Sequence, residues 1–306
     1  MNPFYLGSLF VFLSAAGFGV MSIFAEYAYQ AGATVTGILF WRFLLAALLF
    51  FAIVKMQRAS LRINLRQAAA LFLLGGGLYT LQSFSFFSAV QYITPSLAAL
   101  ILYTFPIFVS ILAFVVDKEK ITRATIGAIL LSVAGVALVL GNSFEGIHPV
   151  GVGFAFAAAL FYSFYIIIGN RVVQNLPPMV TSGYIALFAF LSYLVIALTG
   201  EGIPLHYTGQ AWLAISGIVL CSTVLAIGTF FVGLRLIGST KASVLSTIEP
   251  VITSVCSVLL LGERLTGWQL LGGLIVLLGA ALIVATRGKT GQQQTSASGN
   301  SVDIQG

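Results

Sequence analysis

Apolar residues occur in this chain in long runs, not in the short alternating patterns of a soluble domain. A helix that crosses a bilayer needs about 20 mostly apolar residues, and the chain holds ten runs of about that length, joined by short connections. Their predicted bounds are 6–25, 34–54, 67–88, 95–116, 122–141, 150–169, 178–198, 210–234, 240–261 and 266–285. The pattern predicts an all-α integral membrane protein with ten transmembrane helices. We interpret the first run as a retained helix rather than a signal peptide.

Composition and the placement of charge support a membrane protein. The chain is 59% hydrophobic and 7% charged, whereas a soluble domain carries about a quarter charged residues. The net charge of +6 would suit a nucleic-acid partner, but the loops on the side of the termini hold twelve basic residues and the opposite loops hold one, Arg264. The twelve are Lys55, Arg58, Arg62, Arg66, Lys118, Lys120, Arg123, Arg171, Arg235, Lys241, Arg287 and Lys289. The positive-inside rule therefore predicts cytoplasmic termini in a bacterial-type cytoplasmic membrane, with lipid and not nucleic acid as the partner.

The sequence shows no constellation for enzyme chemistry. Cys221 and Cys256 fall within predicted helices, where cysteine serves as a small apolar filler, and His148 and His206 are lone loop residues. We find no metal-ligand spacing, HExxH, GxSxG or glycine-rich phosphate loop. We therefore expect a protein that is not an enzyme and uses no cofactor or metal. The polar stretch 289–306 is predicted to be a disordered cytoplasmic tail.

The chain contains one unit twice. A shift of 144 residues aligns glycines, a proline and a glutamate, among them Gly7 with Gly151, Pro106 with Pro250, Glu119 with Glu263 and Gly135 with Gly279. We predict a first five-helix repeat at 1–144 and a second at 145–288. Because five is odd, the second copy is inserted upside down, which places DKEKIT at 117–122 in the cytoplasm and LGERLT at 261–266 outside. Inverted repeats are typical of secondary transporters, which bind substrate near the midplane; a scaffold that inherited a duplication is the alternative.

Several motifs carry a family resemblance. They are Trp41-Arg42 in the second helix, TFP at 104–106, EP at 249–250, and EKIT and ERLT at the start of the last helix of each half. With these motifs, residues 4–286 resemble the drug/metabolite transporter superfamily, EamA type, and among its members the chain is most similar to the YddG-type aromatic amino acid exporters. The resemblance implies a carrier for small metabolites.

Glu249 is placed deep in the predicted helix 240–261, about 14 Å from its start and close to the bilayer centre. A carboxylate that faced lipid there would cost at least about 2.5 kcal/mol, so we expect Glu249 to face protein or water. Pro250 removes a backbone donor and frees a carbonyl around Ser246. Thr240, Ser243, Thr247, Pro250 and Ser254 share one helix face, and its counterpart in the first repeat is Ser96, Ala99, Tyr103, Pro106 and Ser110.

Polar and aromatic residues on other helices are expected to line a cavity with Glu249. The predicted substrate-binding residues are Phe18, Met21, Tyr79, Gln82, Ser83, Phe86, Tyr103, Tyr162, Tyr165, Ser246, Thr247 and Glu249. Such a lining suits an amphipathic solute with a large apolar part, and the absence of clustered Lys or Arg there argues against phosphorylated substrates. Small residues and aromatic stripes also serve helix packing, so packing remains an alternative for these faces.

Arg42 lies near mid-depth in the second predicted helix. One interpretation is a structural cation that bonds neighbouring groups, and the other is a partner for Glu249 or for a substrate carboxylate. Pro106 and Pro250 occupy matching places and are predicted hinges. The sequence thus predicts a carrier, functioning as a monomer, that exports small amphipathic metabolites, aromatic amino acids first, by alternating access. A broader drug or neutral amino acid exporter, and an aqueous channel, are the alternatives.

Overall fold

The computed structural model describes residues 3–105, 107–109, 111–112, 123–141, 148–173, 176–200, 206–237, 245–246, 248–279 and 281–282. Pro106, Thr247, the connection 117–122 and the predicted tail 289–306 lie outside these residues, so the expectations about them stay predictions.

The described part of the chain is built from helices and contains no strand. The elements, in order, are α1 (Pro3–Gly19), α2 (Met21–Gln30), α3 (Val35–Met56), α4 (Leu65–Phe72), η1 (Leu73–Tyr79), α5 (Thr80–Val90), α6 (Pro95–Leu102), α8 (Arg123–Gly141), α9 (Pro149–Val173), α10 (Pro178–Thr199), α11 (Gly209–Val219), η2 (Leu220–Leu225), α12 (Ala226–Ile237) and α14 (Glu249–Leu261). A further apolar helix covers Gly267–Gly279. The protein is therefore an all-α membrane protein.

Six helical segments of the described chain are long and apolar enough to cross a bilayer: Phe4–Gln30, Val35–Met56, Leu65–Val90, Pro149–Ile168, Met179–Thr199 and Gly209–Phe230. They coincide with six of the ten predicted runs. The other four runs coincide with α6, α8, α14 and the helix Gly267–Gly279, and the count of ten spans stays a prediction.

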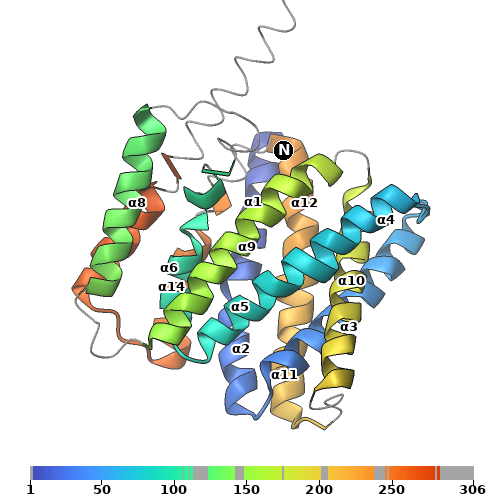
Figure 1. Ribbon diagram of the computed structural model, residues 1–306, viewed down its shortest axis with the longest axis horizontal. Coiled ribbons are helices and arrows are strands. Elements are labelled where there is room, and N and C mark those ends of the chain that lie inside the picture. Colours follow the sequence, from blue (N-terminus) through green and yellow to red (C-terminus); the bar gives the residue numbers. More distant parts are fainter. Residues whose placement is uncertain are drawn as a thin grey trace, which may run out of the picture.

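Corresponding helices of the two halves pack reciprocally. The first span of each half packs on the third span of the other, as α1 on α12 and α9 on α5, while α3 packs along α10 and α6 along α14. Figure 1 shows α1 leaving the end of the molecule that holds the N-terminus, whereas α9 runs in the opposite direction. This exchange of partners is the packing that two units related by a two-fold axis produce.

The helix starts also correspond. Asn64 precedes α4 and its side chain accepts a hydrogen bond from the backbone N–H of Gln67 at 2.8 Å. Thr208, 144 residues later, precedes α11 and accepts from Ala211 at 3.2 Å. Each cap satisfies an N–H that lacks a partner within its helix, so the third span of each half begins with the same type of N-cap hydrogen bond.

The third spans share a second feature, a π-helical segment at mid-length. Residues Leu73–Tyr79 form η1 and Leu220–Leu225 form η2. The hydroxyl of Thr80 donates to the carbonyl of Gly75 at 2.8 Å, and that of Thr223 donates to the carbonyl of Ile218 at 2.9 Å. In both cases the acceptor lies five residues earlier, which matches the wider π turn. Such segments occur often at functional sites.

Candidate functional site

Two helices of opposite halves are interrupted where they approach each other. After α6 ends at Leu102, Tyr103 and Thr104 form a turn and helix resumes at Phe105. In the second half, α14 begins at Glu249 with Pro250 in its first turn. A proline at that position loses nothing, because the first N–H groups of a helix have no intrahelical partner. Pro250 thus favours the interruption at the start of α14, whereas Pro106 lies outside the described residues.

Tyr103 and Glu249 meet at these interruptions. The Tyr103 hydroxyl lies 2.9 Å from Oε2 of Glu249 and 2.7 Å from the backbone carbonyl oxygen of Ser246. Pro250 has no N–H to offer the Ser246 carbonyl four residues earlier, so the Tyr103 hydroxyl takes the place of that missing donor. Glu249 lies in the first turn of α14, where the positive end of the helix dipole favours a carboxylate.

The N-terminal helices close against this point. The hydroxyl of Thr253, one turn into α14, donates to the carbonyl of Gly19 at 2.8 Å. A Cβ atom at Gly19 would lie 3.1 Å from the carbonyl oxygen of Glu249, so a side chain at Gly19 would push α1 away from α14. The break between α1 and α2 at Val20 thus lies directly beside the start of α14.

Six aromatic rings form a continuous row that leads to Glu249. Phe43 of α3 contacts Tyr79 of η1 (ring centroids 5.5 Å apart), Tyr79 stacks on Tyr165 of α9 (5.2 Å), and Tyr165 stacks on Tyr162 (6.1 Å). Tyr162 meets Phe105 edge to face (4.9 Å), and Phe105 meets Tyr103 (5.6 Å). All five spacings fall in the range of about 4.5–7 Å that aromatic pairs prefer. We call Phe43, Tyr79, Tyr165, Tyr162, Phe105 and Tyr103 the aromatic row.

Arg42 lies at the other end of the aromatic row. It is 1% exposed. Its Nε donates to the hydroxyl of Thr223 at 3.1 Å and its Nη2 donates to the hydroxyl of Tyr79 at 3.3 Å. Its guanidinium also lies over the rings of Phe43 and Phe87, at 5.0 and 5.4 Å. Tyr79 and Thr223 are 144 residues apart, so one cation joins equivalent positions of the two halves, both within π-helical segments.

The sequence model of the EamA-like transporter family matches this chain twice, over residues 5–141 and 149–285. The chain belongs to this family. The second match begins 144 residues after the first (149 against 5), the same shift that aligns the chain with itself. Its helical membrane structure and its family together make it a multi-pass membrane transporter of the drug/metabolite superfamily.

Individual proteins agree with this membership. The chain is 30% identical over 253 residues to a probable amino-acid metabolite efflux pump of Salmonella typhimurium, with 78% of this chain and 81% of that protein covered. It is 27% identical over 248 residues to the uncharacterized transporter YyaM of Bacillus subtilis, with the same coverage of 78% and 81%. A solved crystal structure superimposes with a TM-score of 0.66 at 20% identity, covering 92% of this chain and 98% of that one, which shows the fold alone.

This EamA-like transporter brings together some of the residues that the sequence predicts for the site. Tyr79, Tyr103, Tyr162 and Tyr165 belong to the aromatic row, and Ser246 and Glu249 hydrogen-bond to its last member. Pro250 lies buried in the first turn of α14. Arg42 is not bonded to Glu249, since its described partners are Thr223 and Tyr79. Of the two interpretations of Arg42, the structure thus favours the cation that bonds neighbouring groups.

Other predicted residues of the transporter lie in its helix packing. Gln82 and Ser83 are buried on α5, where the Ser83 hydroxyl donates to Gln82 at 3.3 Å. Met21 and Phe86 belong to the main buried core, and Phe18 is half-buried on α1. In the described part of the chain, none of these five has a ring contact or hydrogen bond to the aromatic row.

Three contributors were missed in the sequence. Phe105 completes the aromatic row between Tyr103 and Tyr162. Thr223 accepts a hydrogen bond from Arg42, and the ring of Phe43 packs against the ring of Tyr79. The repeat carried a usable signal for Thr223, because the 144-residue shift aligns it with Tyr79. Phe105 stands in the motif TFP at 104–106, which could have drawn attention to it, whereas Phe43 carried no signal, since phenylalanine is common throughout the chain.

Proposed function

We propose that this transporter exports small amphipathic metabolites, aromatic amino acids first, by alternating access, and that the aromatic row and Glu249 form its substrate path. The observation that carries the proposal is the contact of Tyr103 with Glu249, at the interrupted helices of both halves. A carboxylate beside aromatic rings offers an anchor for an amino group and flat faces for an apolar side chain. The Salmonella relative is named for amino-acid metabolites, which agrees with this substrate class.

The geometry at Tyr103 also suggests how a proton enters the cycle. The hydroxyl carries one proton but lies near two acceptors, the carboxylate of Glu249 and the carbonyl of Ser246. When Glu249 is charged, the Tyr103 hydroxyl donates its proton to only one of these two acceptors at a time. A proton on Glu249 lets the carboxyl group donate to the Tyr103 oxygen while Tyr103 donates to Ser246. Exchange of that proton for a substrate amino group would couple export to a proton gradient.

Transport in proteoliposomes tests the proposal. Vesicles with purified protein are loaded with labelled phenylalanine, tyrosine, tryptophan, leucine or glucose 6-phosphate, and release is followed with and without a proton gradient. We expect saturable release of the aromatic amino acids, with counterflow, and no release of the sugar phosphate. Equal release of leucine would favour the broader neutral exporter. Release that does not saturate would favour a channel, and no release of any amino acid would contradict the proposed substrate class.

A further inference from the structure

A second candidate site lies away from the aromatic row, at the end of α3. It is an open depression of about 570 Å³, within the range of roughly 300–1,000 Å³ that small-molecule sites occupy. One part of its lining is apolar and comes from the outer surface of α3, with Leu48, Phe51 and Ala52. The other part is basic, with Lys55 and Arg58. The site is therefore amphipathic along the direction of the helix axis.

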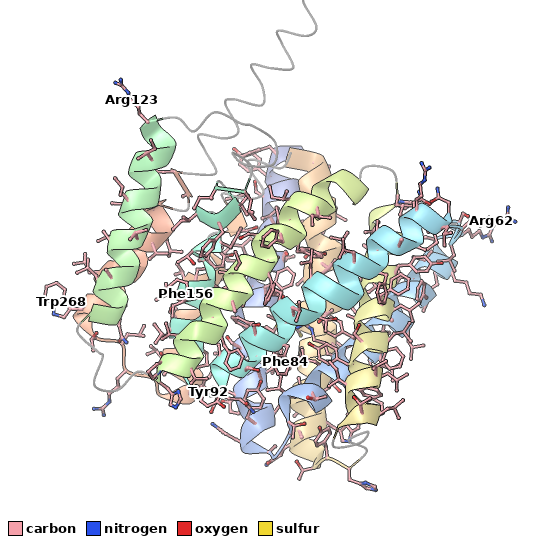
Figure 2. The ribbon with its side chains drawn as sticks, viewed as in Figure 1. Arg62, Phe84, Tyr92, Arg123, Phe156 and Trp268 are labelled. Carbon is pink, nitrogen blue, oxygen red and sulfur yellow. The ribbon has the colours of Figure 1, made fainter. Side chains whose placement is uncertain are left out.

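Within the apolar part, Leu48 and Ala52 face the surroundings of the protein, whereas Phe51 also packs against the core. Leu48 is 59% exposed and lies within the membrane-spanning segment Val35–Met56. Lys55 is in the last turn of that helix, and Arg58 follows the C-cap residue Gln57. Two basic side chains thus lie where the apolar surface ends, at the depth where lipid phosphates are found. Figure 2 shows Arg62, from the same loop, projecting from this end of the molecule.

The backbone at Arg58 points to a role for its side chain. Its φ is +53°, and it is the one non-glycine residue with positive φ in the described part of the chain. Its N–H donates to the carbonyl of Lys55 at 3.1 Å, and the N–H of Ala59 donates to that of Val54 at 3.1 Å. These two bonds form a Schellman cap, in which the left-handed position is usually glycine. An arginine in this left-handed conformation is strained, whereas a glycine would not be. The strain points to a function for the guanidinium group, which glycine lacks.

The wall of the depression is held in place from α10. The Tyr184 hydroxyl donates to the carbonyl of Leu61 at 2.8 Å, and the Tyr184 ring meets Phe51 edge to face at 5.4 Å. Leu61 and Phe51 both line the depression. Tyr184 therefore holds both sides of the depression, the helix α3 and the loop after it, and its contacts keep the shape of the depression.

We infer that this depression binds an anionic phospholipid, with the phosphate between Lys55 and Arg58 and an acyl chain along Leu48, Phe51 and Ala52. The basic residues match the headgroup charge, and the apolar wall matches the chain, which a free phosphate or a soluble metabolite lacks. The inference does not depend on the proposed substrate of the transporter, because no residue of the aromatic row lines the depression.

The test measures lipid binding to the full chain purified in a neutral detergent. Native mass spectrometry follows the binding of dioleoyl phosphatidylglycerol and, for comparison, dioleoyl phosphatidylcholine. We expect tighter binding of phosphatidylglycerol to the wild type. Lys55→Gln and Arg58→Gly should each weaken the binding of phosphatidylglycerol about fivefold, and the double variant about 25-fold. These factors correspond to about 1 kcal/mol of electrostatic attraction per basic residue. Arg123→Gln, a basic residue on α8 at the same end, is the matched control and should bind as the wild type does.

Arg58→Gly also separates lost binding from lost folding. Glycine relieves the left-handed backbone, so this variant should unfold, without added lipid, at the same temperature as the wild type or higher. Undiminished phosphatidylglycerol binding by the double variant would overturn the inference. Displacement of the lipid by millimolar inorganic phosphate, with equal thermal stabilisation, would overturn it as well, because the site would then recognise a free anion.

Discussion

Ser96 donates a hydrogen bond to the carboxylate of Glu263 at 2.9 Å, and this bond joins the start of α6 in the first half to the loop after α14 in the second. The Tyr27 hydroxyl, from α2, donates to the carbonyl of Leu260 at 3.0 Å beside it. Tyr92, four residues before Ser96 in the chain, lies at the lower end of the molecule in Figure 2, whereas Figure 1 marks the N-terminus at the upper end. At this end, the helices that carry Tyr103 and Glu249 are fastened to each other.

Loss of the Ser96–Glu263 bond should open this end of the protein. Ser96→Ala removes a hydrogen bond to a charged group, and we expect a shift of at least tenfold in favour of the open state, equivalent to ~1.5 kcal/mol. The labelling rate of a cysteine at buried Ser257 of α14, measured with an impermeant thiol reagent, reports the shift. Ser8→Ala is the control, because the Ser8 hydroxyl bonds within its own helix. Equal labelling in both variants would argue that this contact does not hold the end closed.

Glu249→Gln should fold normally but lose transport or its pH dependence. Glutamine keeps the shape and an oxygen that accepts from Tyr103, and it removes the charge and the exchangeable proton. We expect at least tenfold slower export of the best substrate. Glu26→Gln is the control, since Glu26 bonds to Gln30 at the end of α2. Because Arg42 has other partners, adding Arg42→Gln should not restore what Glu249→Gln loses. A variant with wild-type rate and pH profile would remove Glu249 from the mechanism.

Thr223→Val should destabilise the protein through Arg42. Valine has the same shape but accepts no hydrogen bond, which leaves Nε of a buried guanidinium without its partner at a cost of about 1–3 kcal/mol. Thermal unfolding in detergent should therefore begin several degrees lower. Thr229→Val, whose hydroxyl bonds only to carbonyls of its own helix, should change far less. Equal unfolding temperatures would mean that Arg42 finds another partner.

Pro250→Ala should slow turnover more than it weakens substrate binding. Alanine supplies an N–H for the Ser246 carbonyl, which then competes with Tyr103 for the same acceptor and favours a continuous helix. Single-turnover export and equilibrium binding, measured on one preparation, separate the two effects. Pro149→Ala, in the first turn of α9, is the matched control. Unchanged turnover would reduce Pro250 to a packing residue.

The predicted topology can be tested at two exposed positions. In a background without Cys221 and Cys256, a cysteine at Ser60 should be protected in intact cells from an impermeant reagent, and one at Gln210 should react. Both residues are exposed in the structure. The expectation follows from the distribution of basic residues. The opposite labelling pattern would overturn the cytoplasmic placement of the termini.

The sequence was most informative where membrane physics leaves few choices. Runs of apolar residues predict helices because lipid offers backbone groups no partner, and all ten predicted runs contain described helix. Pro250 lies in the first turn of α14, where it favours a helix start, whereas Pro106 lies outside the described residues, and the hinge role of both stays a prediction. Ser246, Glu249 and Pro250 lie on one stretch of chain, and Tyr103 of the other half hydrogen-bonds to Ser246 and Glu249 there.

What the sequence could not indicate depends on tertiary packing. Charged side chains are costly in lipid, so the sequence favours a pairing of Glu249 with Arg42. In the structure, Arg42 instead hydrogen-bonds to Thr223 and Tyr79, and Glu249 hydrogen-bonds to Tyr103. The helix periodicity placed Gln82 and Phe86 on the face of Tyr79. In the structure, however, the ring of Tyr79 stacks on Tyr165, whereas Gln82 is buried on α5 and Phe86 lies in the main buried core.

Each π-helical segment gives the third span of its half an adjustable orientation. An α-helix turns about 100° per residue, so one residue more or less within Gly75–Gly77 would rotate Tyr79 around the helix while the capped start at Asn64 stays in place. The same holds for Thr223 beyond Thr208. A single insertion or deletion within such a segment would thus present a different side chain to the interior, which offers this fold a short evolutionary route from one substrate to another.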